Sequence, residues 1–190
     1  MKILNRKKTR IIIGFLLVLI VAAAAGAIWW IRSAIFPRAY QPLVREAAAK
    51  YDLDPLLVAA VVLVESKFDP DAVSPKNAVG LMQIMPGTAV DVAAMQKRKN
   101  FDITQLKKPH VNLDMGCFYL KRLLKRYRGD MALSLAAYHA GPRNVNKWLK
   151  QAGSQDIIKG QEIVAGFAFE VTAHYVENVI GKRKLLRLLY

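Results

Sequence analysis

The sequence is poor in cysteine and in acidic side chains, and both shortages restrict what the protein can be. Its single cysteine, Cys117, excludes an internal disulfide framework, because a disulfide needs two cysteines. Its 14 aspartates and glutamates are outnumbered by 29 lysines and arginines, which gives a formal net charge of +15. A surplus of this size predicts an anionic partner, such as nucleic acid, anionic lipid or an acidic polymer.

The chain also lacks internal repeats, low-complexity segments and strand-like alternation of useful length. Its 54% apolar and 23% charged residues exclude a disordered chain. A length of 190 residues allows one domain with an appendage, and is too short for two full-sized cores. We therefore expect a mainly α fold in a single domain.

Much of the apolar excess lies in residues 11–31, which are 21 consecutive positions without a charged side chain. As a helix this run spans about 31 Å, close to the ~30 Å hydrocarbon thickness of a bilayer. A cleaved secretory signal is the alternative, because Ala25-Gly26-Ala27 is an acceptable cleavage site. The apolar run continues to Ile31, however, and this favours a retained single-pass transmembrane anchor.

Residues 1–10 contain five basic side chains and no acid, which predicts a cytoplasmic N-terminus in a cell membrane. We accordingly divide the chain into a cytoplasmic flank (1–10), an anchor (11–31), a linker (32–40) and an extracytoplasmic domain (41–190). From Arg32 onward the net charge is +10. Because this part faces the outside of the cell, nucleic acid is not expected as a partner, whereas anionic lipid and anionic wall polymers are.

Proline, glycine and capping residues divide the outer domain into helices. Asp54 is a suitable N-cap and Pro55 a suitable first residue for the most apolar helix, which ends at Glu65 and which we expect to be buried. We expect further helices over residues 41–51, 88–97, 112–127 (with Asn112 as its cap), 131–139, 144–150 and 170–189.

Glu65 is out of place at the end of so apolar a helix, where its neighbours one turn back are Val61 and Val62. Burial disfavours an ionised carboxylate and raises its pKa, and a carboxylic acid that stays protonated near neutral pH suits general-acid catalysis. The alternative is an ordinary glutamate that reaches solvent or pairs with Lys67.

Polar side chains suited to a sugar follow Glu65 along the chain. Ser74 precedes the segment Gly80-Leu81-Met82-Gln83-Ile84-Met85-Pro86, in which Gln83 offers donors and an acceptor in an apolar setting. Tyr138 and His139 lie at the end of another predicted helix, and Tyr175 lies on the last one. The alternative for each is ordinary packing within a loop or core.

These motifs together resemble the lytic transglycosylase domain of the soluble-lytic-transglycosylase (SLT) type, a lysozyme-like family. The resemblance extends from about residue 41 to 180 and implies a lysozyme-like helical domain after the transmembrane helix. It also implies cleavage of the β-1,4 bond between N-acetylmuramic acid (MurNAc) and N-acetylglucosamine (GlcNAc) in peptidoglycan, without water, to leave a 1,6-anhydro-MurNAc end.

By this resemblance Glu65 is the catalytic residue, first as general acid and then as general base. Residues that would line the glycan-binding groove are Ser74, Gln83, Met85, Tyr138 and Tyr175. No cofactor is implied. The sequence departs from the family pattern at His139, where asparagine is usual, and at Val171, where the pattern has glutamate.

Other functions remain open at this stage. A goose-type lysozyme on the same fold would hydrolyse the same bond, and a non-catalytic wall-binding module would only bind the glycan. A membrane-surface structural protein would explain the anchor and the charge alone. Asp69 and Asp71 are more typical of turn chemistry than of a second catalytic carboxylate. The histidines, His110, His139 and His174, show no metal-ligand spacing.

Overall fold

The computed structural model describes residues 6–153 and 160–190, and the chain divides into two compact units, residues 1–38 and 39–190. Residues 1–5 of the predicted cytoplasmic flank lie outside the described residues. We refer to residues 39–190 as the outer unit.

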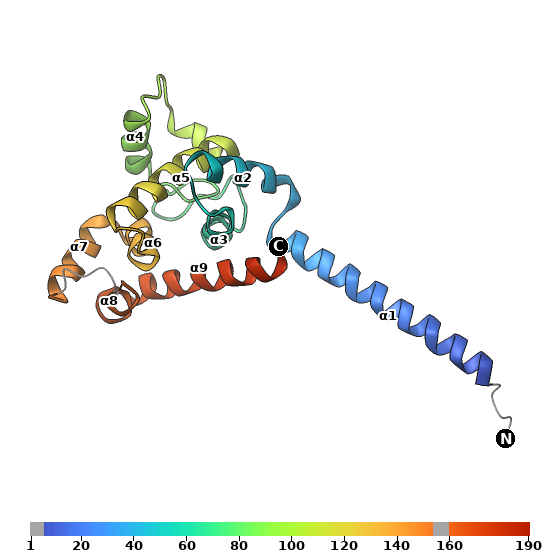
Figure 1. Cartoon of the computed structure of the whole chain (residues 1–190). Coiled ribbons are helices and arrows are strands. Elements are labelled where there is room, and N and C mark those ends of the chain that lie inside the picture. The colour runs from blue at the N-terminus through green and yellow to red at the C-terminus, as the bar shows by residue number, and fades with distance from the viewer. Residues whose placement is uncertain (1–5, 154–159) are drawn as a thin grey trace. The chain divides into compact units, whose positions relative to one another are not determined.

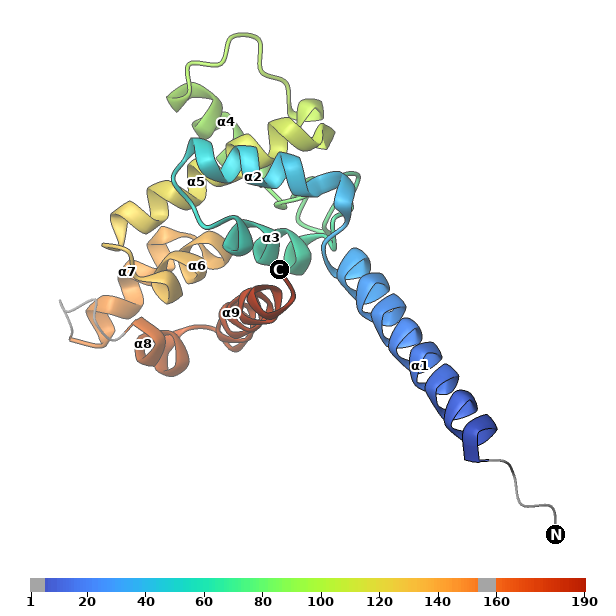
Figure 2. The ribbon, with the colours of Figure 1, turned by 45° about the vertical axis from the view of Figure 1, so that its right-hand side comes forward.

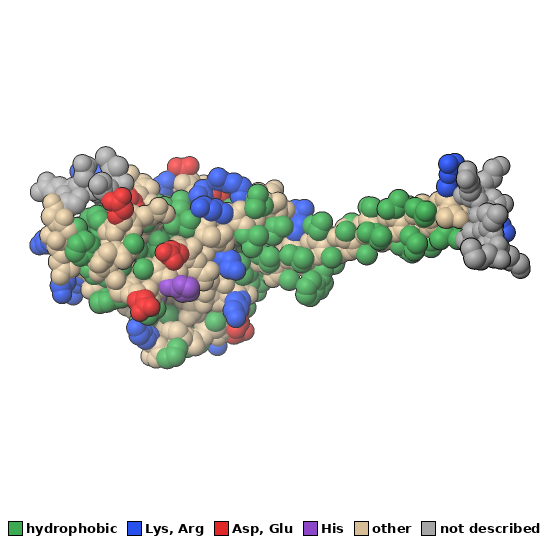
Figure 3. Space-filling view, turned by 90° about the horizontal axis from the view of Figure 1, so that it is seen from below, with side chains coloured by type: hydrophobic (Ala, Val, Ile, Leu, Met, Phe, Trp, Pro, Cys, Tyr) green, Lys and Arg blue, Asp and Glu red, His purple; other side chains and the backbone are tan. Residues whose placement is uncertain are grey.

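The first unit consists mainly of one long helix, α1 (Arg6–Ile35). Hydrophobic side chains are exposed along it, as Figure 3 shows. Its segment Lys8–Ile35 is long and apolar enough to cross a membrane, and the predicted anchor of residues 11–31 lies inside this segment. Near the end of this unit, the Arg38 guanidinium lies 5.1 Å from the centre of the Trp29 ring.

The outer unit is built from helices joined by loops (Figure 1). Its described residues contain no β-strand, only isolated bridges from Val79 to Val73 and to Ile84. The prediction of a mainly α fold is therefore confirmed. The elements are the 3-10 helix η1 (Arg38–Tyr40), α2 (Gln41–Lys50), α3 (Pro55–Glu65), α4 (Pro86–Met95), the 3-10 helix η2 (Ile103–Lys107), α5 (Pro109–Arg126), α6 (Met131–Ala140), α7 (Pro142–Gln151), α8 (Gly160–Phe167) and α9 (Glu170–Leu189).

The apolar helix α3 is the centre of the outer unit, as its sequence predicts. Residues 57–62 are all buried, and the helix packs against α9 on one side and α2 on the other (Figures 1 and 2). The Asp54 carboxylate accepts a hydrogen bond from the Leu56 amide at 2.9 Å, which makes Asp54 the expected N-cap. Around this centre, α5 packs on α2 and α6, and α6 packs on α7, α8 and α9.

Three helices begin earlier than the sequence prediction placed them, and in each case the first residue is a proline. The helices α4, α5 and α7 start at Pro86, Pro109 and Pro142. Proline lacks an N–H, but the first turn of a helix has no partner for that N–H, so proline fits there and its φ is already helical. The predicted starts at residues 88, 112 and 144 are therefore wrong by two or three positions.

Asn112 is consequently not a helix cap but a fully buried side chain inside α5. Its amide nitrogen donates hydrogen bonds to the carbonyls of Val79 at 2.8 Å and Leu106 at 2.9 Å. Its amide oxygen accepts a hydrogen bond from the Met82 amide at 2.7 Å. Gly80 has a φ of 78° and lies so close that any Cβ there would overlap the Asn112 side chain. The Asn112 side chain thus attaches the loop that follows α3 to the helix α5.

Replacing Asn112 should destabilise the outer unit strongly. In Asn112→Ala two buried backbone groups lose their partner and a third, the Val79 carbonyl, keeps only the Ile84 amide, and we expect the free energy of unfolding to fall by about 2–5 kcal/mol. Denaturant unfolding of the full chain in detergent, followed by circular dichroism, measures this change. Asn178→Ala on α9, which removes no hydrogen bond between described residues, is the matched control; equal losses in the two variants would contradict the role of Asn112.

Candidate active site

Glu65 is the last residue of α3, and the chain leaves the helix abruptly behind it. Ser66 ends the helix and donates hydrogen bonds from its hydroxyl to the carbonyls of Val62 at 3.3 Å and Leu81 at 2.9 Å. Lys67 and Phe68 both have positive φ, 54° and 66°, so the backbone turns sharply. Ser66 therefore joins the end of α3 to the loop that Asn112 also holds.

The carboxyl group of Glu65 is mostly buried, as its position on an apolar helix predicts. Tyr175 on α9 donates a hydrogen bond from its hydroxyl to Glu65 Oε1 at 2.8 Å. Burial raises the pKa of Glu65 to about 7, although the hydrogen bond from Tyr175 favours the ionised form and opposes this shift. No ion pair joins Glu65 to Lys67 in the part of the chain that the structure describes, so the alternative of a solvated, paired glutamate is not what the fold provides.

Tyr175 is itself positioned by α6. The His139 ring stacks on the Tyr175 ring with 4.5 Å between centres, and His139 Nδ1 lies 3.1 Å from the Thr172 hydroxyl. Burial raises the pKa of Tyr175 well above its ordinary value, and the nearby Glu65 carboxylate adds to the shift. Burial lowers the pKa of His139, and the positive charge of Lys76 lowers it further. Both rings are therefore neutral at pH 7, so Tyr175 remains a hydrogen-bond donor.

Tyr138, the neighbour of His139, supports the site from the loop side. Its hydroxyl donates a hydrogen bond to the Met82 carbonyl at 2.8 Å, and its ring lies 5.6 Å from the ring of Tyr119. Burial raises its pKa well above the ordinary value, with a further contribution from the Glu65 charge. Tyr138 is thus close enough to Glu65 to be affected by its charge, but its hydroxyl binds the backbone.

Ser74, Gln83 and Met85 lie on the segment between α3 and α4. The Ser74 hydroxyl accepts a hydrogen bond from the Ala78 amide at 3.0 Å. The Gln83 amide nitrogen donates to the carbonyls of Ala72 at 3.1 Å and Gly80 at 3.0 Å. Two of the predicted glycan-binding side chains therefore stabilise their own loop.

Met85 has a different environment, because 43% of its surface is exposed where α4 begins. In the described residues none of Ser74, Gln83 and Met85 hydrogen-bonds to Glu65. The structure thus brings Tyr138 and Tyr175 together with Glu65, and places the other three residues along the adjoining loop.

The two aspartates that follow Glu65 take part in turn and surface contacts. Asp69 accepts a hydrogen bond from the Asp71 amide at 2.9 Å, as expected for a turn. Asp71 lies 3.6 Å from the ammonium group of Lys107, and both side chains are exposed. Glu65 is therefore the one carboxyl group that the described residues place against Tyr175.

Sequence reasoning did not find Ser66 or Thr172 as parts of this arrangement. In the sequence, Ser66 is only the residue that follows Glu65. Its hydrogen bond to the Leu81 carbonyl depends on the path of the loop, which the sequence does not predict. Thr172 lies three residues before Tyr175, a helical spacing that could have indicated a shared face. Among the described residues no three His, Cys, Asp or Glu side chains lie close enough together to hold a metal ion.

Comparison with known proteins places this geometry in context. A family model described as Transglycosylase SLT domain matches residues 42–160, well over half of the chain. The soluble lytic murein transglycosylase of Escherichia coli (strain K12) is 33% identical over 162 residues, which cover 84% of this chain and 25% of that protein. The membrane-bound lytic murein transglycosylase C of Actinobacillus pleuropneumoniae (serotype 5b, strain L20) is 44% identical over 95 residues, 47% of this chain and 25% of that protein.

Solved structures of lytic transglycosylases are also similar to this chain. The 70 kDa soluble lytic transglycosylase of Escherichia coli superposes with a TM-score of 0.75 at 32% identity, covering 88% of this chain and 27% of that one. An inactive mutant of lytic transglycosylase Slt from Pseudomonas aeruginosa, in which glutamine replaces a glutamate, gives 0.71 at 31% identity, with 80% and 24% covered. The chain spans about a quarter of the length of these relatives.

The raised pKa of Glu65 predicts a pH-dependent stability difference. Because the folded-state pKa of about 7 exceeds the ordinary 4.5, the folded state binds a proton more tightly than the unfolded state. The stability contribution of this proton is fully present below pH 4.5 and is lost as the pH rises through 7. Glu65→Gln keeps a neutral side chain at every pH, so above pH 7 it should be more stable than the wild type by up to about 3 kcal/mol.

The measurement is the free energy of unfolding of both proteins in detergent from pH 4 to 8. Glu177→Gln on the exposed face of α9 is the control, because that carboxyl group lies at the surface. A constant difference between Glu65→Gln and the wild type at all pH values would show that Glu65 is not held in its protonated form.

Proposed function

The chain belongs to the transglycosylase SLT family, and from this membership we propose that it is a peptidoglycan lytic transglycosylase. In this proposal the outer unit cleaves the β-1,4 bond between MurNAc and GlcNAc and leaves a 1,6-anhydro-MurNAc end. The observation that carries the proposal is the buried carboxyl group of Glu65, with a pKa of about 7 and a single tyrosine donor.

Glu65 acts first as a general acid. A pKa of about 7 keeps a large share of the molecules protonated at neutral pH, whereas an ordinary glutamate would be almost fully ionised. The proton passes to the glycosidic oxygen, and the bond from that oxygen to C1 of MurNAc breaks. The leaving GlcNAc end therefore departs as a neutral alcohol.

Glu65 acts next as a general base. As a carboxylate it accepts the proton of the C6 hydroxyl of the same MurNAc residue, and that oxygen forms the new bond to C1. The Glu65 proton is thereby restored, and water takes no part. Because the nucleophile is supplied by the substrate, one carboxyl group is enough, in contrast to the pair that most glycoside hydrolases use.

The remaining residues hold Glu65 in position for both steps. The Tyr175 hydroxyl donates its hydrogen bond to Oε1 of Glu65. The other carboxyl oxygen has no hydrogen-bond partner among the described residues, and we assign it to the sugar. His139 stacks on Tyr175 and limits its movement. We assign Ser74, Gln83 and Met85 to the glycan-binding surface beside Glu65, with Tyr138 supporting the loop that carries them.

The relatives support this assignment by their names and by one variant. A lytic transglycosylase in which glutamine replaces a glutamate is described as inactive, which is the behaviour expected of an essential carboxyl group. Another related structure is a complex with bulgecin A, so a relative of this fold binds that small molecule. A goose-type lysozyme or a non-catalytic wall-binding module would keep the same fold, and product chemistry separates all three.

We further propose that residues 11–31, which lie inside the candidate span Lys8–Ile35, anchor the protein in the cell membrane with residues 1–10 in the cytoplasm. The basic residues that precede the apolar run support this orientation, and a relative is named as membrane-bound. The outer unit, including the SLT domain from residue 41, then works on the extracytoplasmic face, where peptidoglycan lies.

Replacement of the proposed acid tests the reaction. Glu65→Gln should lower the rate of release of 1,6-anhydro muropeptides by at least about a thousandfold, because it removes the only proton donor of the mechanism. Purified peptidoglycan is digested with the full chain in detergent, and the products are analysed by mass spectrometry.

Glu177→Gln is the matched control and should leave the rate unchanged. Reducing ends in place of anhydro ends would identify a hydrolase, and glycan binding without any cleavage would identify a binding module. Full activity of Glu65→Gln would refute the assignment of Glu65.

Labelling of single cysteines tests the orientation of the anchor. In a Cys117→Ala background, Lys99→Cys in the loop after α4 should react with a membrane-impermeant maleimide in intact cells, because the proposal places it outside. Thr9→Cys should react only after the membrane is permeabilised. The reverse pattern would show that the orientation is wrong, and labelling of both sites in intact cells would argue against a spanning anchor.

A further inference from the structure

The last turns of α9 carry an exposed stripe that the reaction does not use. It consists of Lys184, Leu185, Arg187 and Leu188, which we call the α9 end stripe. All four are exposed, and 85% of the Leu188 surface is accessible. Lys184 lies three and four residues before Arg187 and Leu188, and Leu185 lies three before Leu188, so the four share one broad side of the helix.

The opposite side of the same turns faces the core, so the stripe is a distinct surface. Leu186 and Val179 are buried there. Arg183 is also turned inward, because its guanidinium pairs with the Asp54 carboxylate at 2.6 Å. Asp54 caps α3, so this contact fixes the rotation of α9 about its axis and thereby the direction of the stripe.

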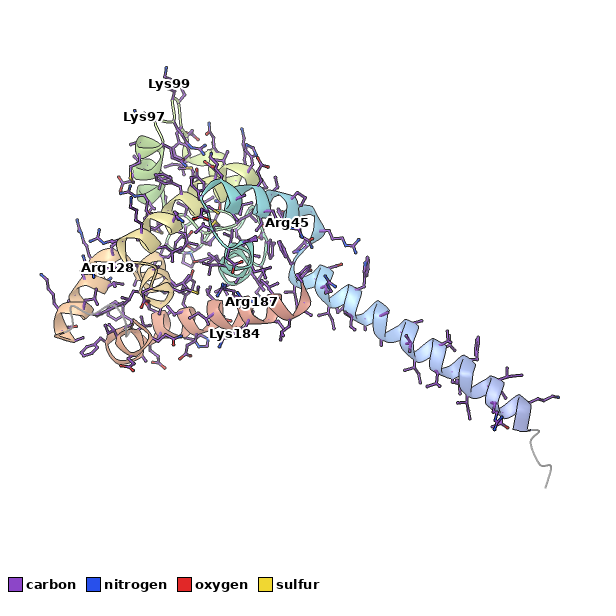
Figure 4. All side chains as sticks on the ribbon, in the orientation of Figure 1. Arg45, Lys97, Lys99, Arg128, Lys184 and Arg187 are labelled. Carbon is purple, nitrogen blue, oxygen red and sulfur yellow. The ribbon has the colours of Figure 1, made fainter. Side chains whose placement is uncertain are left out.

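The stripe has the chemistry of a surface that binds anionic lipid. Two exposed leucines alternate with Lys184 and Arg187, which Figure 4 marks on the last turns of α9. No acidic residue follows Glu177 in the sequence of this helix. Leucines inserted at the level of the lipid headgroups, with basic side chains on the phosphates, are the usual composition of a helix that lies on a membrane.

The connection to α1 brings this surface within reach of a membrane. Only residues 36–40 separate α1 from α2, and five residues extend over at most about 18 Å. Within the outer unit, the start of α2 and the C-terminal end of α9 lie on the same side, as Figures 1 and 2 both show. The stripe is therefore on the side of the outer unit to which the proposed anchor is connected.

We propose that the α9 end stripe docks on the anionic lipid headgroups of the membrane in which α1 is anchored. This contact goes beyond the lytic reaction, and it rests on the proposed anchor. One covalent connection does not by itself fix the orientation of the outer unit on the membrane, whereas a second contact through α9 does. Because α9 also carries Tyr175, docking sets the direction from which a glycan strand reaches Glu65.

An environment-sensitive fluorophore on single cysteines tests this contact. The full chain with Cys117→Ala is placed in lipid nanodiscs that contain phosphatidylcholine, with or without phosphatidylglycerol, and a lipid-borne quencher. In discs with phosphatidylglycerol, a probe at Leu188→Cys should be quenched several-fold more than a probe at Lys99→Cys. Without phosphatidylglycerol the two should be nearly equal.

Removal of the charges gives the matched comparison. Lys184→Gln with Arg187→Gln should reduce the quenching at position 188 to the level at position 99, whereas Lys147→Gln with Lys150→Gln on α7 should not. Strong quenching at Leu188→Cys that survives the first pair, or equal quenching at positions 188 and 99 in anionic discs, would overturn the proposal.

A probe at Leu19→Cys separates this outcome from failure of the anchor. Quenching at position 19 without quenching at position 188 refutes docking alone. Absence of quenching at position 19 refutes the anchor as well.

Discussion

The three hydrogen bonds of Asn112 are the constraint on which the site depends. The loop between α3 and α4 has almost no regular secondary structure, so side chains must satisfy and position its backbone. With the loop attached to α5, the Leu81 carbonyl meets Ser66 and the Met82 carbonyl meets Tyr138. Ser66 is covalently next to Glu65. The buried side-chain amide of Asn112 on α5 thus determines which hydrogen bonds are made at the C-terminal end of α3.

The carboxyl group at that helix end combines two opposing effects. Burial at the end of α3 holds the proton on Glu65, while the hydroxyl of Tyr175 stabilises the ionised form. A reaction in which one group first gives and then takes a proton needs both forms to be accessible at similar cost. The apolar sequence of α3 buries Glu65, and α9 supplies the Tyr175 hydroxyl. The close packing of these two helices therefore also determines the pKa of Glu65.

Much of this could be predicted from sequence because it depends on local patterns. The all-apolar stretch of α3 predicts both its burial and the raised pKa of Glu65. The sequence prediction places the helix starts at Pro86 and Pro109 two and three residues too late, in the second case because it assigns Asn112 as the N-cap although Asn112 lies inside α5. The loop was beyond sequence reasoning for a different reason: its contacts join positions 30 and 56 residues apart, and that from Tyr175 to Glu65 joins positions 110 residues apart.

The close approach of Gly80 to Asn112 limits which substitutions this chain can accept. A side chain at position 80 would occupy the space of the Asn112 amide and the Leu106 carbonyl, and its φ of 78° would strain the backbone as well. Loss of the Asn112 amide would not make room for a larger residue at 80, because the Leu106 carbonyl would still lie 2.5 Å from its Cβ, and the loop would lose its attachment to α5. We therefore expect glycine at position 80 to be required whatever residue occupies position 112, although 32 positions separate the two in the chain.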